Sequence, residues 1–341
     1  MPADQSHAMS LPLPSPMTTA PRAQRGRSLM ELMIALVIGV IILGSIMLMT
    51  TNTNTGGQQS STQGRMSEDA QLVLAILGPQ IRMAGYSGVV NDRTDGVAYK
   101  RFMGPAIRGC DNGFANLQTA AWRGDAAQRH SDLLTCAAGD GAAISILYEA
   151  DALNTVPNAA GNPTDCLGRQ VNQVPSSLQA QAPSAAAANV TVVENRFFLQ
   201  RQGATFDLLC VGNGVNAGGA FTRSEPLISN IEQLQVLYGV SNATVPTQSA
   251  TGFNQYGNQV VGYLTAAQID QQFTAATDPD NDRWMRVVNV KLCVTVRSEK
   301  PEASEPIAYV NCAGQVITPN DRFLRRTAQG TFALRNRSGI L

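Results

Sequence analysis

Few residues in this chain have the types and spacing that catalysis requires. The 341 residues include two histidines, His7 and His130. Nucleophilic catalysis needs a base beside a Ser or Cys, and triad members converge from separate segments, so the run His130-Ser131-Asp132 is better interpreted as a surface turn. Glycine-rich nucleotide loops and the HExxH zinc motif are absent from the sequence. We therefore predict no catalytic residue and no enzymatic activity.

One acidic cluster has spacing that suits calcium. Asp278, Asp280 and Asp282 alternate as the oxygen ligands of calcium loops do. However, Arg283 occupies the position where an EF-hand needs glycine, and the twelfth position lacks the usual glutamate. We favour a solvated turn before a strand at Trp284, and keep the three aspartates as weak calcium candidates. No metal or other cofactor is predicted.

Six cysteines lie in the C-terminal two thirds of the chain, without a CxxC pair. Because zinc-ligand spacing is absent, disulfides in an oxidising compartment explain them better than metal does. Buried free thiols in a cytosolic core are the alternative. Six cysteines permit 15 pairings. Nearness in sequence suggests three pairs: Cys110 with Cys136, Cys166 with Cys210, and Cys293 with Cys312.

The overall charge gives no reason to expect a polyanionic partner. Lys+Arg and Asp+Glu are equal at 25 each, and charged residues make up 15% of the chain. No net field therefore attracts DNA or an acidic membrane surface, and nucleic-acid binding is not expected. The C-terminus is locally basic, and we interpret its arginines as outward-facing strand residues: Arg322, Arg325, Arg326, Arg335 and Arg337.

An uncharged apolar run covers residues 32–49, close to the lower limit for a membrane-spanning helix. No small-residue cleavage site follows it, so the segment should remain in the mature protein. The nearest downstream positive charge is Arg65, whereas three arginines lie upstream: Arg22, Arg25 and Arg27. This asymmetry predicts a cytoplasmic N-terminus and an extracytoplasmic remainder.

Glu31 stands at the start of the apolar run. A carboxylate near hydrocarbon is unfavourable and needs a partner of opposite charge. An incidental acid in the headgroup region is the alternative interpretation.

The string of residues 25–33, RGRSLMELM, resembles the class III signal of type IV prepilins and pseudopilins. The resemblance implies that prepilin peptidase cuts between Gly26 and Arg27 and leaves the apolar helix attached. It also implies that Glu31, fifth after the cut, neutralises the N-terminal amine of a neighbouring subunit. The family usually has Phe or Met at the first position after the cut, where this chain has Arg27.

Further strings resemble the PilW family: RMAGY at residues 82–86, LQVLYGV at 234–240 and ALRNR at 333–337. The resemblance implies a minor pilin that joins other minor pilins and the major pilin, primes pilus assembly, and lies near the fibre tip, often with a tip adhesin. J-type pseudopilins of type II secretion have a related build and give the first alternative function. A membrane-anchored periplasmic enzyme is the second.

Apolar residues at three- and four-residue steps predict an amphipathic helix: Met66, Ala70, Val73, Leu77, Ile81 and Ala84. Pro79 should kink this helix or end its regular part, and Gly85 should cap its C-terminus. Three glycines predict a softened or broken stretch near residues 50–64: Gly56, Gly57 and Gly64.

Short β-branched and aromatic runs predict an antiparallel sheet. They cover residues 143–149, 190–193, 196–199, 206–210, 233–240, 287–296 and 331–334. In residues 233–240, Leu234, Val236, Tyr238 and Val240 should face the core, opposite a wet face that includes Gly239. Residues 175–189 are low in complexity and should form a surface loop.

The predicted organisation is a pilin-like α+β protein. It comprises a leader at residues 1–26, a transmembrane half-helix at 27–50, a periplasmic half-helix at 51–86, and a β-rich extracytoplasmic domain with disulfides at 87–341. The expected location is the inner membrane, with a single pass and a periplasmic domain, followed by the pilus fibre at the cell surface.

Overall fold

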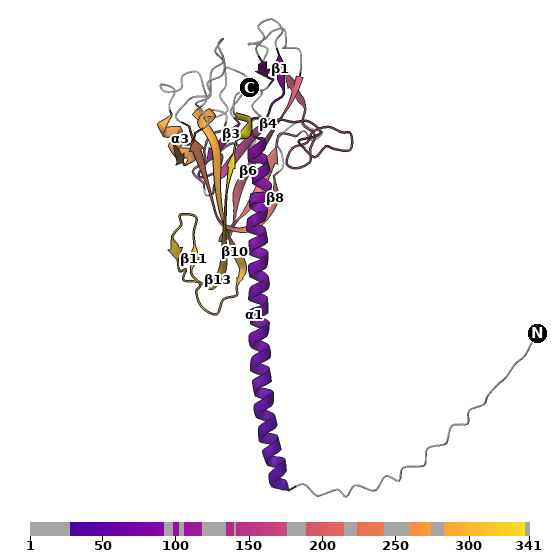
Figure 1. The fold of residues 1–341 in the computed structure, drawn as a ribbon, viewed down its shortest axis with the longest axis vertical. Coiled ribbons are helices and arrows are strands. Elements are labelled where there is room, and N and C mark those ends of the chain that lie inside the picture. The colour runs from indigo at the N-terminus through magenta and orange to yellow at the C-terminus, as the bar shows by residue number, and fades with distance from the viewer. Residues whose placement is uncertain are drawn as a thin grey trace, which may run out of the picture. The chain divides into compact units, whose positions relative to one another are not determined.

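A long N-terminal helix and an antiparallel sheet are the main elements of the computed structural model (Figure 1). The structure describes residues 28–91, 98–101, 106–117, 134–139, 141–175, 189–214, 224–241, 259–273 and 283–337. The chain divides into two compact units, Met1–Gly57 and Gln58–Leu341.

Helix α1 is continuous from Leu29 to Met83, a length of 55 residues. The predicted break near residues 50–64 is therefore wrong. Each glycine costs about 1 kcal/mol of helix propensity, but extending a helix that is already nucleated on both sides requires no new nucleation. The helix also continues past Pro79 to Met83, so the proline does not end it.

The apolar stripe of α1 is buried, as the periodicity predicted. Its six members are at most 3% exposed: Met66, Ala70, Val73, Leu77, Ile81 and Ala84. Gly85 follows the helix with φ +72°, and its N–H donates to the Leu147 carbonyl at 2.8 Å. A residue with a side chain rarely adopts this φ, which confirms Gly85 as the C-terminal cap.

Nine strands form the main sheet, and every described pair in it is antiparallel. The order is β13-β10-β8-β7-β6-β4-β3, with β5 beside β6 and β9 beside β8. The strands are β3 (Ile107–Cys110), β4 (Ala143–Glu149), β5 (Gln173–Pro175), β6 (Asn189–Gln202), β7 (Thr205–Gly212), β8 (Glu225–Val240), β9 (Gly262–Leu264), β10 (Val287–Pro301) and β13 (Phe323–Ala333).

Smaller elements complete the domain. Two hairpins pair β1 (Val89–Asn91) with β2 (Ala98–Lys100), and β11 (Tyr309–Val310) with β12 (Val316–Ile317). The short helices are α3 (Ala266–Gln272), η3 (Arg283–Arg286) and η4 (Arg335–Arg337). Trp284 lies in η3, so the expected strand begins three residues later, at Val287.

Each predicted run lies in or overlaps an observed strand, most of which are longer, whereas β3, β5, β9 and the strands of the two small hairpins were not predicted. Strand β4 has the predicted bounds, whereas the two runs at 190–193 and 196–199 belong to one strand, β6. Polar residues at 194–196 interrupted the sequence pattern, yet Glu194 and Arg196 are fully buried and paired at 2.6 Å. The low-complexity residues 176–188 lie outside the described residues.

The core lies between α1 and one face of the sheet. The predicted inward side chains of β8 are at most 8% exposed: Leu234, Val236, Tyr238 and Val240. Gly239, expected on the wet face, is buried beside Asn289 of β10. The helix and the sheet therefore share one hydrophobic core, which fixes the packed part of α1 on the domain.

Candidate assembly surface

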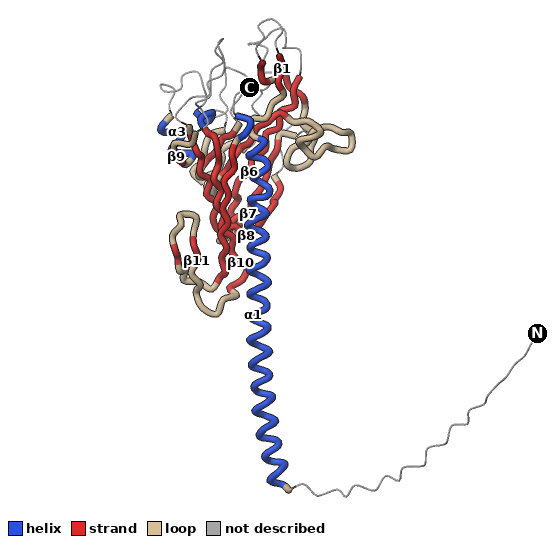
Figure 2. Tube along the Cα trace, in the orientation of Figure 1, coloured by secondary structure: helices blue, strands red, loops and turns tan. Residues whose placement is uncertain are grey.

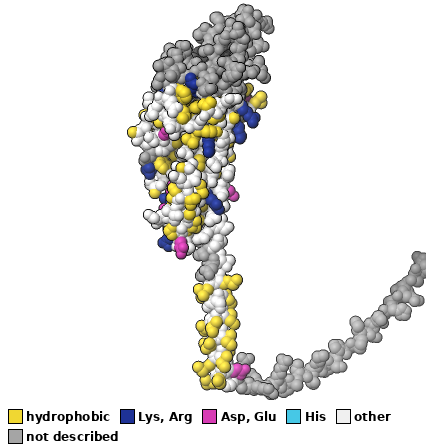
Figure 3. All heavy atoms as spheres, turned by 60° about the vertical axis from the view of Figure 1, so that its left-hand side comes forward, with side chains coloured by type: hydrophobic (Ala, Val, Ile, Leu, Met, Phe, Trp, Pro, Cys, Tyr) yellow, Lys and Arg dark blue, Asp and Glu magenta, His cyan; other side chains and the backbone are white. Residues whose placement is uncertain are grey.

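The N-terminal part of α1 exposes apolar side chains all around. Leu29–Thr50 is a 22-residue helical segment with mean hydropathy 2.9, and none of its residues is buried. Figure 3 shows hydrophobic side chains covering this segment. Its length and composition suit a membrane span. Such a surface is stable only when lipid or other apolar helices cover it.

Glu31 is the only charged residue in this segment and lies in the first turn of α1. Its backbone N–H donates to the Ser28 carbonyl at 2.9 Å. The residues three, four and seven positions further, Ile34, Ala35 and Ile38, lie on the same helix face. The carboxylate therefore has apolar neighbours on its own face of the helix. Gly26 and Arg27 lie outside the described residues.

Two hydroxyl groups in the exposed segment bond to the preceding turn. Ser45 Oγ donates to the Ile41 carbonyl, and Thr50 Oγ1 donates to the Ile46 carbonyl at 3.0 Å. These internal bonds satisfy the hydroxyl donors. The segment can therefore face hydrocarbon without an unpaired hydroxyl at either position.

The C-terminal end of α1 contacts the end of β13 and η4. Asn336 Nδ2 donates to the Arg82 carbonyl at 2.9 Å and to the Met83 carbonyl at 3.3 Å. The Phe332 ring packs on Gly78, and the Arg82 guanidinium lies 5.2 Å from the centre of that ring. The RMAGY and ALRNR strings thus meet in space, a contact that sequence reasoning missed.

A buried polar group also fastens α1 to the sheet. Asn195 Nδ2 donates to Gln80 Oε1 at 2.9 Å, and Asn195 Oδ1 accepts from the Cys166 N–H at 2.9 Å. Burial raises the pKa of the neighbouring Tyr148 to about 12, although hydrogen bonds to Gln80 and Asn195 act in the opposite direction. These bonds define the register of α1 against β4 and β6.

Three disulfides have the pairing expected from nearness in sequence. Their Cα–Cα distances are 5.3 Å for Cys110–Cys136, 6.6 Å for Cys166–Cys210 and 5.6 Å for Cys293–Cys312. These distances lie within the usual range for disulfides. All six cysteines are thereby bonded.

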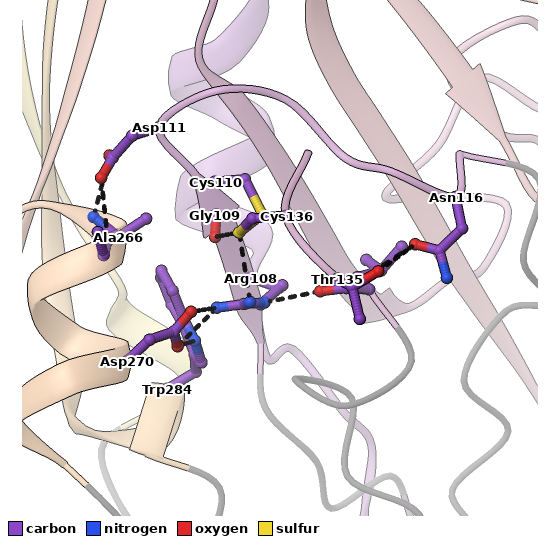
Figure 4. Close-up of a disulfide and its surroundings, with 12 residues drawn as sticks. Arg108, Gly109, Cys110, Asp111, Asn116, Thr135, Cys136, Ala266, Asp270 and Trp284 are labelled. Atoms are coloured by element: carbon purple, nitrogen blue, oxygen red, sulfur yellow. Dashed lines mark hydrogen bonds and ion pairs between the residues drawn. A yellow bond between two sulfur atoms is a disulfide. The ribbon is translucent and has the colours of Figure 1, made fainter. Parts of the chain in front are cut away.

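An ion pair stacked on a tryptophan lies beside the Cys110–Cys136 disulfide (Figure 4). The Arg108 Nη1 donates to both Asp270 carboxylate oxygens at 2.8 Å, and its guanidinium lies 4.9 Å from the centre of the Trp284 ring. Trp284 Nε1 also donates to Asp270 at 3.1 Å. Asp270 therefore binds both Arg108 and Trp284 in one network. Arg108 is 162 residues from Asp270, so no local pattern pointed to this network.

The remaining sequence candidates are not tested by the structure. Asp278, Asp280, Asp282 and the run 130–132 lie outside the described residues. Within the residues described, no group of three or more His, Cys, Asp or Glu could hold a metal ion.

The basic C-terminus requires two corrections. Arg322 precedes β13, and Arg335 and Arg337 lie in η4, so these three arginines are not strand residues. Arg325 is 4% exposed and pairs with Glu232 and Asp321, both at 2.7 Å, so it is not an outward-facing residue. Its hydrogen bonds lower the pKa of Asp321. Arg326 is exposed and donates to Gln63 Oε1 at 3.1 Å.

The comparison with protein families concerns the sheet and the C-terminus. Residues 196–336 match the PilW family. This family is described as type IV pilus-assembly protein W. The PilW match begins within β6, ends in η4 and covers less than half of the chain, without α1. It includes Asn336, which binds the end of α1, and the Cys293–Cys312 disulfide.

Two other comparisons add less. Among solved structures, the chain is similar to the type IV-like pilin TTHA1219 from Thermus thermophilus, with 10% identity and a TM-score of 0.36. The similarity covers 81% of this chain and 99% of that chain. No curated protein matches the chain.

Proposed function

We propose that this protein is a minor pilin, a structural subunit that is incorporated into type IV pili and helps to prime their assembly. The observation that carries the proposal is an exposed apolar helix with one acid in its first turn, followed by a domain that matches PilW. The PilW match supports a role in pilus assembly. The proposed role is structural, and the ion pairs that Asp270 forms with Arg108 and Arg283 support it.

In this proposal Glu31 selects the position of α1 among neighbouring helices. Placing an ionised carboxylate in hydrocarbon costs several kcal/mol of free energy unless a cation pairs with it. Cleavage between Gly26 and Arg27 by prepilin peptidase would create a positively charged amine close to Glu31 in sequence. The amine of a neighbouring subunit would then pair with Glu31 and set the axial register of the two helices.

The proposed location is the inner membrane before assembly and the fibre afterwards. Leu29–Thr50 would span the bilayer once, with the domain in the periplasm. Three disulfides support this placement, because the periplasm is oxidising. The proposed partners are other minor pilins, the major pilin and a tip adhesin.

Replacement of Glu31 tests the proposal. We expect Glu31→Ala to accumulate in the inner membrane but to fall at least about tenfold in sheared pili, since the cost of an unpaired carboxylate no longer enforces register. Glu68→Ala is the control, because Glu68 is an exposed acid on the packed part of the same helix. Equal incorporation of Glu31→Ala and wild type would contradict the role of Glu31.

A deletion strain separates the pilus from a secretion system. Loss of surface pili and of twitching, with secretion unchanged, is the expected result. A secretion defect with normal pili would instead indicate a type II pseudopilin.

A further inference from the structure

The loop at residues 151–165, between β4 and β5, exposes aliphatic side chains at its tip. Leu153 is 95% exposed and Val156 is 81% exposed, more than any other large hydrophobic side chain in the described residues. Ala152, Pro157 and Ala159 are exposed beside them. Figure 2 shows the loop in tan, projecting beside the sheet.

Hydrogen bonds fix the backbone that carries both side chains. Asp151 Oδ1 accepts from the N–H groups of Leu153 at 2.7 Å and Asn154 at 2.9 Å. Thr155 Oγ1 donates to the Asp151 carbonyl at 2.8 Å, and Thr164 Oγ1 donates to the Val156 carbonyl. The loop therefore holds Leu153 and Val156 outward instead of folding them onto the domain.

The base of the loop is fastened to the sheet. The Cys166–Cys210 disulfide joins the residue after the loop to β7. Asp165 Oδ1 accepts from the N–H groups of Leu167 at 2.9 Å and Arg169 at 3.0 Å, and its Oδ2 accepts from Gly214 at 2.9 Å. The tip is thus fixed relative to the core of the domain.

We propose that Leu153 and Val156 form a knob that inserts into an apolar socket on another subunit of the same pilus. The proposal rests on the proposed function. Exposed aliphatic groups gain free energy when another surface removes them from water, and a rigid loop loses little conformational entropy on binding.

The charged residues of the loop favour an apolar protein surface over a lipid surface as its partner. Residues 151–168 contain no Lys or Arg, and two aspartates, Asp151 and Asp165, flank the tip. Arg169, the next cation along the chain, lies 3.9 Å from Glu225. Membrane-binding loops use basic residues against anionic headgroups and aromatic residues at the interface, and this loop has neither. The tip residues between the two aspartates carry no charge, so an apolar socket can bury them without desolvating an ion.

The test compares two exposed apolar sites in the full-length chain, expressed in its own host. Leu153→Ser/Val156→Ser removes the knob, and Val316→Ser is the control because Val316 is 73% exposed elsewhere on the domain. Both variants should unfold at the wild-type temperature. We expect the double variant to fall at least about tenfold in sheared pili, as loss of an anchor side chain does at other interfaces, and Val316→Ser to remain at the wild-type level.

A photo-crosslinking residue at position 153 identifies what covers the tip. The expected adduct joins this chain to another pilus subunit, and the double variant should not compete with wild type for that site. The knob proposal would be contradicted by adducts with lipid, by the absence of any adduct, or by normal incorporation of the double variant. If wild-type chain is absent from pili, the proposed function and the knob both fail; if wild type is present and the double variant is equally present, the knob alone fails.

Discussion

The two parts of helix α1 differ in which side chains they bury. In Leu29–Thr50 apolar residues surround the helix and none is buried, whereas in residues 66–83 an apolar stripe is buried and polar residues such as Glu68, Gln71 and Arg82 are exposed. The same backbone conformation therefore serves two environments. The stripe packs on the sheet of the same chain, whereas no described residue buries the first segment, which needs lipid or other helices to cover it.

This difference separates folding from assembly. Each large side chain in the stripe contributes roughly 1.5–3 kcal/mol through burial, so the stripe stabilises the domain. Substitutions in the first segment should leave that stability unchanged and affect only what covers the helix. The predictions below compare the two parts, beginning with the largest expected effect.

The largest effect is expected at Leu77, which is fully buried in the stripe. We expect Leu77→Ala to lower the free energy of unfolding by about 2–5 kcal/mol, because the lost burial leaves a cavity. The measurement is denaturant unfolding of the full-length protein in detergent, followed by tryptophan fluorescence, since Trp284 is 1% exposed. Leu36→Ala, in the exposed segment, is the control and should not change domain unfolding. Equal losses would remove the distinction between the two parts.

The second effect concerns pH and the contact between α1 and the sheet. Tyr148 has a pKa raised to about 12 by burial, whereas an unfolded tyrosine ionises near 10. Above about pH 10 the unfolded state loses this proton first, so stability is fully present below pH 10 and falls between about 10 and 12, by about 2–3 kcal/mol. Buried Tyr238, whose pKa burial also raises, adds to the same alkaline loss.

Tyr148→Phe isolates that contribution. At neutral pH the free energy of unfolding of the variant should be about 1 kcal/mol lower, because the hydrogen bonds of the hydroxyl are lost. Above about pH 10, however, its stability should fall less steeply than that of the wild type. Denaturant unfolding at several pH values measures both changes. Parallel curves for wild type and variant would contradict a buried, neutral Tyr148 at the helix contact.

The smallest effects come from two glycine substitutions, at Gly78 in the packed part of α1 and at Gly57 between the two parts. A side chain at Gly78 would collide with the Phe332 ring, so Gly78→Ala should destabilise the domain by about 1–3 kcal/mol. At Gly57 an added Cβ has nothing within 4 Å, so Gly57→Ala should stabilise the helix by about 1 kcal/mol. Domain unfolding and hydrogen exchange along α1 measure the two changes. If both variants changed stability in the same direction, the result would be inconsistent with this packing.

Local sequence pattern was enough to predict the elements that only need to bury apolar side chains in the hydrophobic core. The stripe of α1, the cap at Gly85 and the bounds of β4 follow from periodicity and backbone preference. The disulfide pairs followed from nearness in sequence, since each joins neighbours among the six cysteines.

Contacts between distant segments could not be predicted in the same way. Arg108 and Asp270 are 162 residues apart, and each is an ordinary charged residue in its own segment. Within β6, Glu194 and Arg196 looked like an interruption because burial of a charge depends on a partner that periodicity does not reveal. The helix continued through its glycines because helix on both sides was already formed, which local propensity does not include.

The most direct test of the account is mass spectrometry of the N-terminus of this chain, purified from sheared pili. We predict a mature chain that begins at Arg27 and retains Glu31 as its fifth residue. A chain in the membrane that keeps the leader from Met1, and is missing from pili, would contradict the account.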